Sequence, residues 1–277
     1  SNISLGFESS LSMTTSVGNV AIGHQAGKAI ATVGELQGDK NVLIGYQSGT
    51  ALTTGDDNVC IGSGAGVAIT SGSNGNGGNV CIGKEAGDRI TTGTKNICIG
   101  QGTDVDSGTA VNRIAIGIDT VNTADNTVII GNGANTISNN CNSTAWTAAS
   151  DLRLKENIES SNAGMQVIND LRPVTFNWKK KKEIDPALDR YYKENSEEPA
   201  LGKKYGTKIH GFIAQEVKSV IDKHPEIKDG FGMWRETGDG VQELGDGALM
   251  PIVVKALQEL KAENDQLKAR IEALENK

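Results

Sequence analysis

A five-residue frame of the form Asn-Val-x-Ile-Gly recurs through the first half of this 277-residue chain and constrains its fold more than any other feature. The glycines that close the frame are spaced 17, 22, 17, 21, 17, 17 and 14 residues apart, so the base period is 17. The copies are "NISLG" (2–6), "NVAIG" (19–23), "NVLIG" (41–45), "NVCIG" (58–62), "NVCIG" (79–83), "NICIG" (96–100), "RIAIG" (113–117) and "TVIIG" (127–131). A short repeat of fixed period predicts one strand–turn unit stacked many times, in a mainly β, β-prism or β-helix-like fold.

Each frame is interpreted as a short strand closed by a turn. Successive side chains of a strand point to opposite faces, so in the fourth frame Val59 and Ile61 share one face and Cys60 takes the other. Glycine suits the turn, and asparagine at the start suits a turn or a ladder of side-chain amides. Nearly every middle residue is small or apolar, so we expect one face in the chain's own core. We expect the other face of each strand to pack against neighbouring subunits around a symmetry axis, where small residues let strands approach closely. A solenoid of a single chain is the alternative.

Composition separates residues 1–149 from the rest of the chain. They hold 25 of the 35 glycines, 17 charges and only three aromatic residues, Phe7, Tyr46 and Trp146. Large apolar side chains supply most of the burial energy of an ordinary core, so an isolated globule is not expected here. The net charge of −7 makes a nucleic-acid partner unfavourable. No apolar run is long enough for membrane insertion, and the chain opens on Ser1 without a signal-peptide pattern. The absence of Met at position 1 suggests a piece of a longer protein.

Three of the four cysteines occupy equivalent places in the repeat. Cys60, Cys81 and Cys98 are each the middle residue of a frame. We expect them to be small buried side chains that stay reduced. The sequence has no CxxC pair and no Cys/His spacing suited to a metal, so neither a metal site nor a cofactor is expected.

Patterns typical of an α+β domain begin after residue 150. They predict an amphipathic helix over 161–171 with a Ser or Asn cap, a strand over 172–179 after a proline break, a strand running into a helix over 207–221, and a strand at "FGMWRE". The charged run 179–204 is interpreted as a solvated insertion.

The C-terminus, residues 250–277, has the heptad pattern of a coiled coil. Position a falls on Met250, Leu257, Asn264 and Ile271, and position d on Val253, Leu260, Leu267 and Leu274. Leucine at d with one asparagine at a is compatible with a dimer or a trimer, so the heptad does not fix the number of chains. The alternative is a surface helix packed on its own domain.

The border between the two parts reads "TAASDLRLKENIE" and contains a serine and a lysine five residues apart, Ser150 and Lys155. Lysine can serve as the general base for a serine nucleophile when burial favours its neutral form. A separation of five residues places the two side chains roughly 140° apart on a helix and on opposite faces of a strand. They can therefore meet only if the chain turns between them or if they come from different subunits.

Four segments in this order resemble the intramolecular chaperones of phage tailspikes and tail fibres, the endosialidase C-terminal domain family. They are "SDLRLKENI" (150–158), "LRPVTFNWK" (171–179), "HGFIAQEV" (210–217) and "LMPIVVKALQELKAEN" (249–264). The resemblance covers most of 150–277. It implies that three such domains bring three chains together, let the preceding fibre fold as a homotrimer, and then cut themselves off before the motif serine.

Carried over to this sequence, the resemblance assigns Ser150 as the nucleophile, Lys155 as the general base and Ala149–Ser150 as the cleaved bond. Asp151, Gln215 and Glu216 are candidates for support of the site. The chain would be a single-turnover, self-cleaving serine endopeptidase, with a fibre domain over 1–149 and a chaperone domain over 150–277. Residues 1–149 are not expected to contain a turnover enzyme.

The fibre part resembles the L-shaped tail fibres of siphophages, which implies a virion component assembled in the host cytoplasm. Its partner would be a receptor on the host surface, a glycan in our interpretation. Turns and insertions over 34–40 and 71–78 are candidate contact surfaces, because loops on rigid scaffolds commonly carry recognition. The alternatives are a polysaccharide depolymerase with the same chaperone and a trimeric adhesin head. A glycosidase needs a carboxylate pair and aromatic sugar platforms, and residues 1–149 have almost no aromatics.

Overall fold

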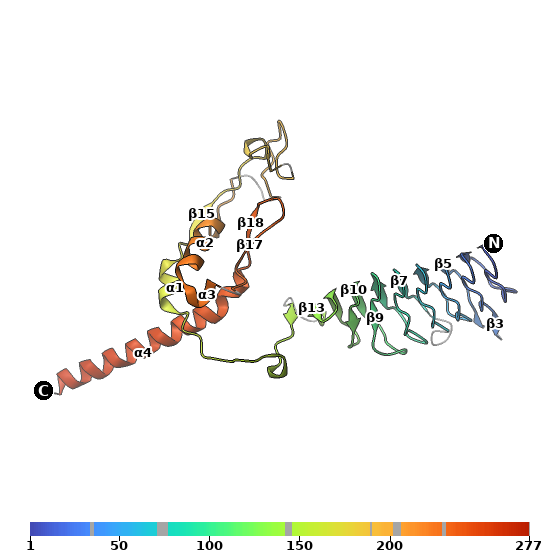
Figure 1. Cartoon of the computed structure of the whole chain (residues 1–277), viewed down its shortest axis with the longest axis horizontal. Helices are drawn as coiled ribbons and strands as arrows, with labels where there is room; N and C mark the ends of the chain where they lie inside the picture. The colour runs from blue at the N-terminus through green and yellow to red at the C-terminus, as the bar shows by residue number, and fades with distance from the viewer. Residues whose placement is uncertain are drawn as a thin grey trace. The chain divides into compact units, whose positions relative to one another are not determined.

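A computed structural model describes residues 1–33, 36–70, 77–141, 146–188, 190–201, 206–228 and 231–276. The chain divides into two compact units, Ser1–Lys155 and Glu156–Lys277 (Figure 1).

The first unit is a β-solenoid in which the repeated frames form the strands of one sheet. The ten strands of this sheet follow the order β1-β2-β5-β6-β7-β8-β10-β12-β13-β14. They are β1 (Ile3–Leu5), β2 (Val20–Ile22), β5 (Val42–Ile44), β6 (Val59–Ile61), β7 (Val80–Ile82), β8 (Ile97–Ile99), β10 (Ile114–Ile118), β12 (Val128–Asn132), β13 (Asn135–Asn139) and β14 (Thr147–Ala148). From β1 to β12 neighbouring strands pair in parallel and in the register of the frame, so that Cys60 lies opposite Cys81 and Cys81 opposite Cys98. The strands β13 and β14 close the sheet as antiparallel partners.

Two short strand pairs lie outside this sheet. The strands β9 (Asp104–Val105) and β11 (Val121–Asn122) pair in parallel between the last coils. The strands β3 (Thr32–Val33) and β4 (Leu36–Gln37) form an antiparallel pair within the first insertion. Of the two candidate contact surfaces, residues 34–35 of the range 34–40 and residues 71–76 of the range 71–78 lie outside the described residues.

The core of the solenoid combines small and large side chains from two parts of each repeat. From β2 to β10 the middle residues of the frames, such as Leu43, Cys60 and Ala115, are fully buried. Facing them are large residues of the segment after the glycine turn, namely Ile30, Leu52, Ile69 and Ile90. The core of this β-solenoid is therefore built within one chain. The small middle residues belong to this core face, and contact of the other strand face with neighbouring subunits stays a prediction.

The three repeat cysteines confirm the prediction made for them. Cys60, Cys81 and Cys98 are free thiols and fully buried. The hydrogen bond with the Cys81 thiol, and next burial, raise the pKa of Cys98, so this thiol stays protonated. All three cysteines serve as small core residues.

A ladder of buried asparagines holds the coils together at the start of each strand. The side-chain amide of Asn58 donates to Oδ1 of Asn41 at 3.0 Å, and Asn79 repeats this bond to Oδ1 of Asn58 at 3.0 Å. The backbone N–H of Asn79 donates to the same Oδ1 atom at 3.1 Å. Each asparagine thus satisfies a backbone group as well as its neighbour, which makes the residue type specific for this place.

The frame glycines are required because successive coils touch there. Gly62 has a φ of +133°, and a Cβ atom on it would lie 2.4 Å from the carbonyl oxygen of Gly83. No side chain fits such an approach, so the glycine spacing in the sequence marks the line where coils stack most closely.

The outer face of the sheet carries two columns of half-buried aliphatic side chains. They come from the residues on either side of each buried middle residue, for example Val59 and Ile61 around Cys60. The same alternation holds in β2, β5 and β7. The result is a continuous, uncharged aliphatic face along the solenoid, which we call the Val/Ile face.

The second unit is an α+β domain with a small core. Its elements are α1 (Met165–Asp170), β15 (Val174–Phe176), η3 (Lys181–Glu183), β16 (Ile209–Gly211), α2 (Ala214–Lys223), α3 (Pro225–Lys228), β17 (Trp234–Glu236), β18 (Gln242–Leu244), η4 (Asp246–Leu249) and α4 (Met250–Glu275). The strands form two antiparallel pairs, β15 with β16 and β17 with β18. Val167, Val217, Met233 and Ile252 bring α1, α2, the loop before β17 and α4 into one core.

The predicted strands and the 207–221 strand–helix element are confirmed, whereas the helix predicted over 161–171 is shorter. It begins at Met165 because Gly164, and neither Ser161 nor Asn162, is its N-cap. The N–H of Met165 donates instead to Oε2 of Glu259 on α4 at 2.8 Å. The first turn is therefore held by a distant carboxylate that local sequence does not reveal.

Ion pairs within the charged run 179–204 explain its composition. Lys181 pairs with Glu198 at 2.6 Å and Lys180 with Glu197 at 2.5 Å. A backbone bridge between Lys180 and Pro199 joins the two sides of the segment. These contacts are consistent with a solvated insertion whose charges neutralise one another.

The helix α4 packs on its domain only at its start. Ile252 and Ala256 are buried there, whereas every described residue after Leu260 is exposed. The predicted heptad positions lie on another face, where Leu257, Leu267 and Leu274 are exposed by 55–69%. The heptad stripe is thus free for other chains to cover.

Candidate functional site

A single turn of 3-10 helix shapes the segment between the serine and the lysine of the border. This turn, η2 (Leu152–Leu154), follows Asp151 as N-cap and ends at Lys155 as C-cap. Asp151 accepts a hydrogen bond from the N–H of Arg153 at 2.8 Å, and the N–H of Lys155 donates to the carbonyl of Leu152 at 3.1 Å. The turn reverses the chain between Ser150 and Lys155.

This reversal brings the two predicted residues together within one chain. The ammonium group of Lys155 donates to Oγ of Ser150 at 2.7 Å. The sequence allowed contact only through a turn or between subunits, and η2 supplies the turn. Ala149, the predicted acyl side of the cleaved bond, directly follows β14 and is exposed, as are Ser150 and Lys155.

The contact has the connectivity of a nucleophile and its base, but its surroundings are open to water. A lysine accepts a proton only when its neutral form is favoured, which requires burial or a nearby positive charge. In the single chain the amine of Lys155 is exposed and donates to Oγ of Ser150. The two side chains are therefore close enough for a proton to pass between them, and both are open to water.

Asp151 is part of the local scaffold of this turn. Its carboxylate pairs with the guanidinium of Arg153 at 2.8 Å. The side-chain and backbone hydrogen bonds from Arg153 lower the pKa of Asp151. The aspartate thus fixes the start of η2, and with it the position of Lys155 relative to Ser150.

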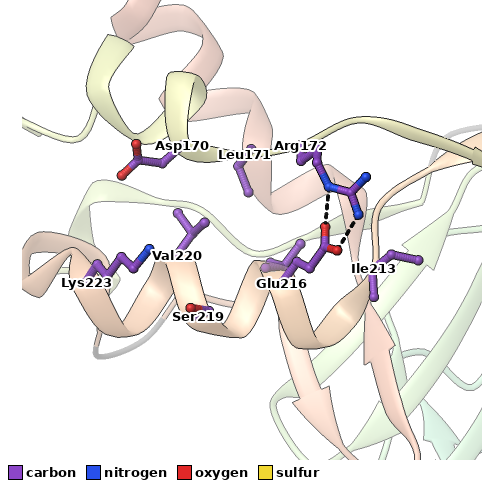
Figure 2. A pocket seen from close by; sticks show the side chains of 9 residues that line it. Asp170, Leu171, Arg172, Ile213, Glu216, Ser219, Val220 and Lys223 are labelled. Atoms are coloured by element: carbon purple, nitrogen blue, oxygen red, sulfur yellow. Dashed lines mark hydrogen bonds and ion pairs between the residues drawn. The ribbon is translucent and has the colours of Figure 1, made fainter.

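The other two candidates lie on α2 in the second unit and have different surroundings. Gln215 is exposed, whereas Glu216 lines a pocket of about 220 Å³ between the end of α1 and α2. Figure 2 shows Glu216 turned toward Arg172, with Leu171 and Val220 on the apolar part of the pocket. The guanidinium of Arg172 binds the carboxylate through two hydrogen bonds, which lower the pKa of Glu216.

Arg172 is a residue that sequence reasoning missed. It stands in the quoted segment "LRPVTFNWK", but nothing in a single sequence pairs it with Glu216, which lies 44 positions further along. The ion pair joins the second and third of the four resembling segments, so it fixes the position of α2 against the chain entering β15.

Metal-ligating groups and membrane-spanning helices were also sought among the described residues. Among the described residues, no three His, Cys, Asp or Glu side chains group in a way that would hold a metal ion. No described helix combines the length and apolar character that a membrane crossing requires.

Comparison with known families adds one finding to this geometry. Residues 150–224 match the model of the Peptidase_S74 family, described as chaperone of endosialidase. This part of the chain is an endosialidase-type chaperone domain. No curated protein and no solved structure matches the chain.

The match starts at one residue of the candidate site and contains a second contact described above. It begins at Ser150, the residue that contacts Lys155, and it includes the Arg172–Glu216 pair. Chaperone domains of this family are typical of phage tail fibres and tailspikes, where they act on trimeric fibres and remove themselves by autoproteolysis. The domain follows a β-solenoid here, which agrees with the architecture expected from the sequence.

Proposed function

We propose that this chain is part of a phage tail fibre that recognises a host receptor, and that its chaperone domain trimerises the fibre and then cuts the Ala149–Ser150 bond. The observation that carries the proposal is the 2.7 Å contact between Lys155 Nζ and Ser150 Oγ at the first residue of the family match. A mature fibre of residues 1–149 would remain on the virion, and the chaperone of residues 150–277 would be released.

The chemistry needs only groups of this chain and one water molecule. Oγ of Ser150 attacks the carbonyl carbon of Ala149 and gives its proton to the neutral amine of Lys155. The C–N bond breaks as the lysine returns the proton to the Ser150 nitrogen, which leaves an ester between Ala149 and Ser150 Oγ. Water then hydrolyses the ester and yields the Ala149 carboxylate and a free Ser150 amine and hydroxyl.

Assembly supplies the condition that the single chain lacks. Ser150, Lys155 and Ala149 are exposed, so a neighbouring subunit that covers this segment would remove water from it and favour the neutral amine. Cutting would then follow correct assembly instead of preceding it. Once the chaperone has left, the assembled fibre cannot easily unfold, which gives it kinetic stability.

Two surfaces of the chain support a homotrimer. The Val/Ile face of the solenoid is apolar and continuous over the parallel strands, and large exposed apolar patches mark interaction sites. The heptad stripe of α4, including Leu257, Leu267 and Leu274, is exposed on the other unit. Both surfaces repeat along their length, so a second and third copy of the same chain match them in spacing.

The test is the intact mass of purified wild-type chain beside two variants, Ser150→Ala and Lys155→Ala. We expect two wild-type fragments, 1–149 and 150–277, and a single uncut chain for each variant. The matched control Ser160→Ala, which changes an exposed serine after the turn, should cut like the wild type. Dilution below the range in which trimers form should slow wild-type cutting.

The possible outcomes separate the parts of the proposal. An uncut wild type that sedimentation shows to be a folded trimer contradicts autoproteolysis. Normal cutting by Lys155→Ala excludes this lysine as the base. A rate that does not change with dilution means that the dyad is complete within one chain.

A further inference from the structure

Three aromatic rings stack along an outer corner of the solenoid near its N-terminal end. Phe7, His24 and Tyr46 each follow the closing glycine of a frame in three successive coils. Their ring centroids are 5.4 Å and 5.3 Å apart, with interplanar angles of 23° and 18°. Phe7 is 68% and Tyr46 53% exposed, so two of the very few aromatic residues of this unit lie on its surface.

A second column of polar side chains runs beside the rings. Nε2 of Gln25 donates to Glu8 Oε2 at 2.8 Å, and Nε2 of Gln47 donates to Gln25 Oε1 at 3.0 Å. Each of these residues holds a left-handed backbone conformation, with φ between 53° and 58°. The corner therefore presents stacked rings and linked amides side by side.

Both columns stop at the same coil. The next coil places Ser63 after Tyr46 and Gly64 after Gln47, as shown by the Gly64 N–H that donates to the Tyr46 carbonyl at 2.9 Å. Ser63 is exposed, whereas a Cβ atom on Gly64 would be in ordinary contact with the Glu85 side chain at 3.5 Å, so the opening at this coil lies above Ser63. One coil further, Lys84 and Glu85 form an exposed ion pair at 3.3 Å. We call the gap between Tyr46 and this ion pair the Ser63 step.

The size of the Ser63 step follows from the regular rise of the coils. Paired strands are about 4.8 Å apart, so Tyr46 and Lys84 stand about 10 Å apart along the solenoid. A ring stacked on Tyr46 occupies the position that Tyr46 occupies relative to His24, directly above Ser63. The step thus leaves room for one ring between the aromatic face and the Lys84–Glu85 pair.

We infer that the Ser63 step binds a single pyranose residue of a saccharide, a conclusion that rests on the proposed receptor-binding function. The C–H face of a pyranose is apolar and suits the electron-rich face of Tyr46. Its hydroxyl groups reach the Gln47 amide and the Ser63 hydroxyl, with the Glu85 carboxylate and Lys84 at the far side. One aromatic face with a few polar groups that fix orientation is the composition of a small-molecule site.

Charge argues against a nucleotide in the same place. A nucleobase also stacks on an aromatic ring, but its phosphate needs a free positive charge. The nearest cation, Lys84, is paired with Glu85, and residues 1–149 hold 11 acidic against 6 basic residues. A neutral saccharide meets no such penalty.

The experiment measures saturation-transfer NMR on the full chain with the methyl glycosides of glucose, galactose, mannose, rhamnose and N-acetylglucosamine. We expect saturable binding of at least one of them to the wild type, weakened about tenfold or more by Tyr46→Ala, because stacking on the ring is lost. Ser63→Tyr should abolish binding by continuing the ring column into the step, while the solenoid stays folded. The matched control Phe7→Ala, at the far end of the column, should leave the affinity unchanged.

Several results would overturn this inference. They are the absence of saturable binding of all five glycosides, unchanged binding by Ser63→Tyr, or an equal loss in Phe7→Ala. If Tyr46→Ala and Ser63→Tyr change the oligomeric mass in sedimentation, the ring column is a subunit contact and the inference is also wrong. Cleavage of the same samples, read from intact mass, tests the chaperone proposal independently.

Discussion

Replacing one buried asparagine of the ladder should destabilise the solenoid by several kcal/mol. Asn58 is fully buried in the middle of the ladder. Asn58→Ala removes its amide bonds to Asn41 Oδ1 and to the Asp56 carbonyl, at 3.0 Å and 3.1 Å. It also removes the oxygen that accepts from the backbone N–H and the side-chain amide of Asn79.

The size of the effect depends on which groups keep a second partner. The Asn79 amide still donates to the Gly93 carbonyl, Asn41 Oδ1 still accepts from the Asn58 backbone N–H, and the Asp56 carbonyl still accepts from Gly78. The Asn79 backbone N–H has no such alternative and stays buried, which costs about 1–3 kcal/mol. With the other lost bonds, we expect a loss of about 3 kcal/mol in the free energy of unfolding.

Guanidinium unfolding in the Ser150→Ala background, at fixed chain concentration, measures this loss from the solenoid transition. Hydrogen exchange of peptides that cover β7 should increase at Asn79. Asn132→Ala, an exposed asparagine at the end of β12, serves as control and should change stability by about 0.5 kcal/mol or less. A loss below about 1 kcal/mol for Asn58→Ala would refute the reasoning, since it would mean that the Asn79 N–H finds another partner or water.

Two buried titratable groups predict that each unit loses stability as pH rises, but over different pH ranges. Burial, and next the carboxyl of Asp88, raise the pKa of Asp104 to about 7 from an ordinary value of 3.8, so solenoid stability should fall as pH rises between these values. Asp104→Asn should flatten this dependence and stabilise the solenoid at pH 8 in thermal unfolding. His224 is buried between Asp170 and Glu226, whose hydrogen bonds raise its pKa above the ordinary 6.5. The chaperone domain should therefore be most stable below pH 6.5 and lose stability above it. His224→Gln should remove this loss of stability with rising pH. A wild-type stability that does not change with pH in either unit would contradict the role given to Asp104 or His224 in that unit.

The repeat, the strand alternation and the reduced cysteines were readable in the sequence because each depends on local geometry. A period of 17 residues with glycine at its end specifies coil stacking, and alternation within the frame places Cys60 opposite Val59 and Ile61. The same locality made α2 and the strands β15, β16 and β17 predictable, whereas β18 (Gln242–Leu244) was not predicted. The resemblance of residues 150–277 to the phage chaperones agrees with the family match over 150–224.

Only the tertiary structure decided which face of the strands is the core and how the border residues meet. The large core residues, such as Ile69, lie in the weaker second frame, and their burial against Cys60 appears only when the coil closes. The contact of Lys155 with Ser150 depends on a turn of three residues, η2, where helix or strand geometry would have kept them apart. The Arg172–Glu216 pair and the ring column join residues that are remote in sequence, and such contacts follow from chain packing, which a single sequence does not encode locally.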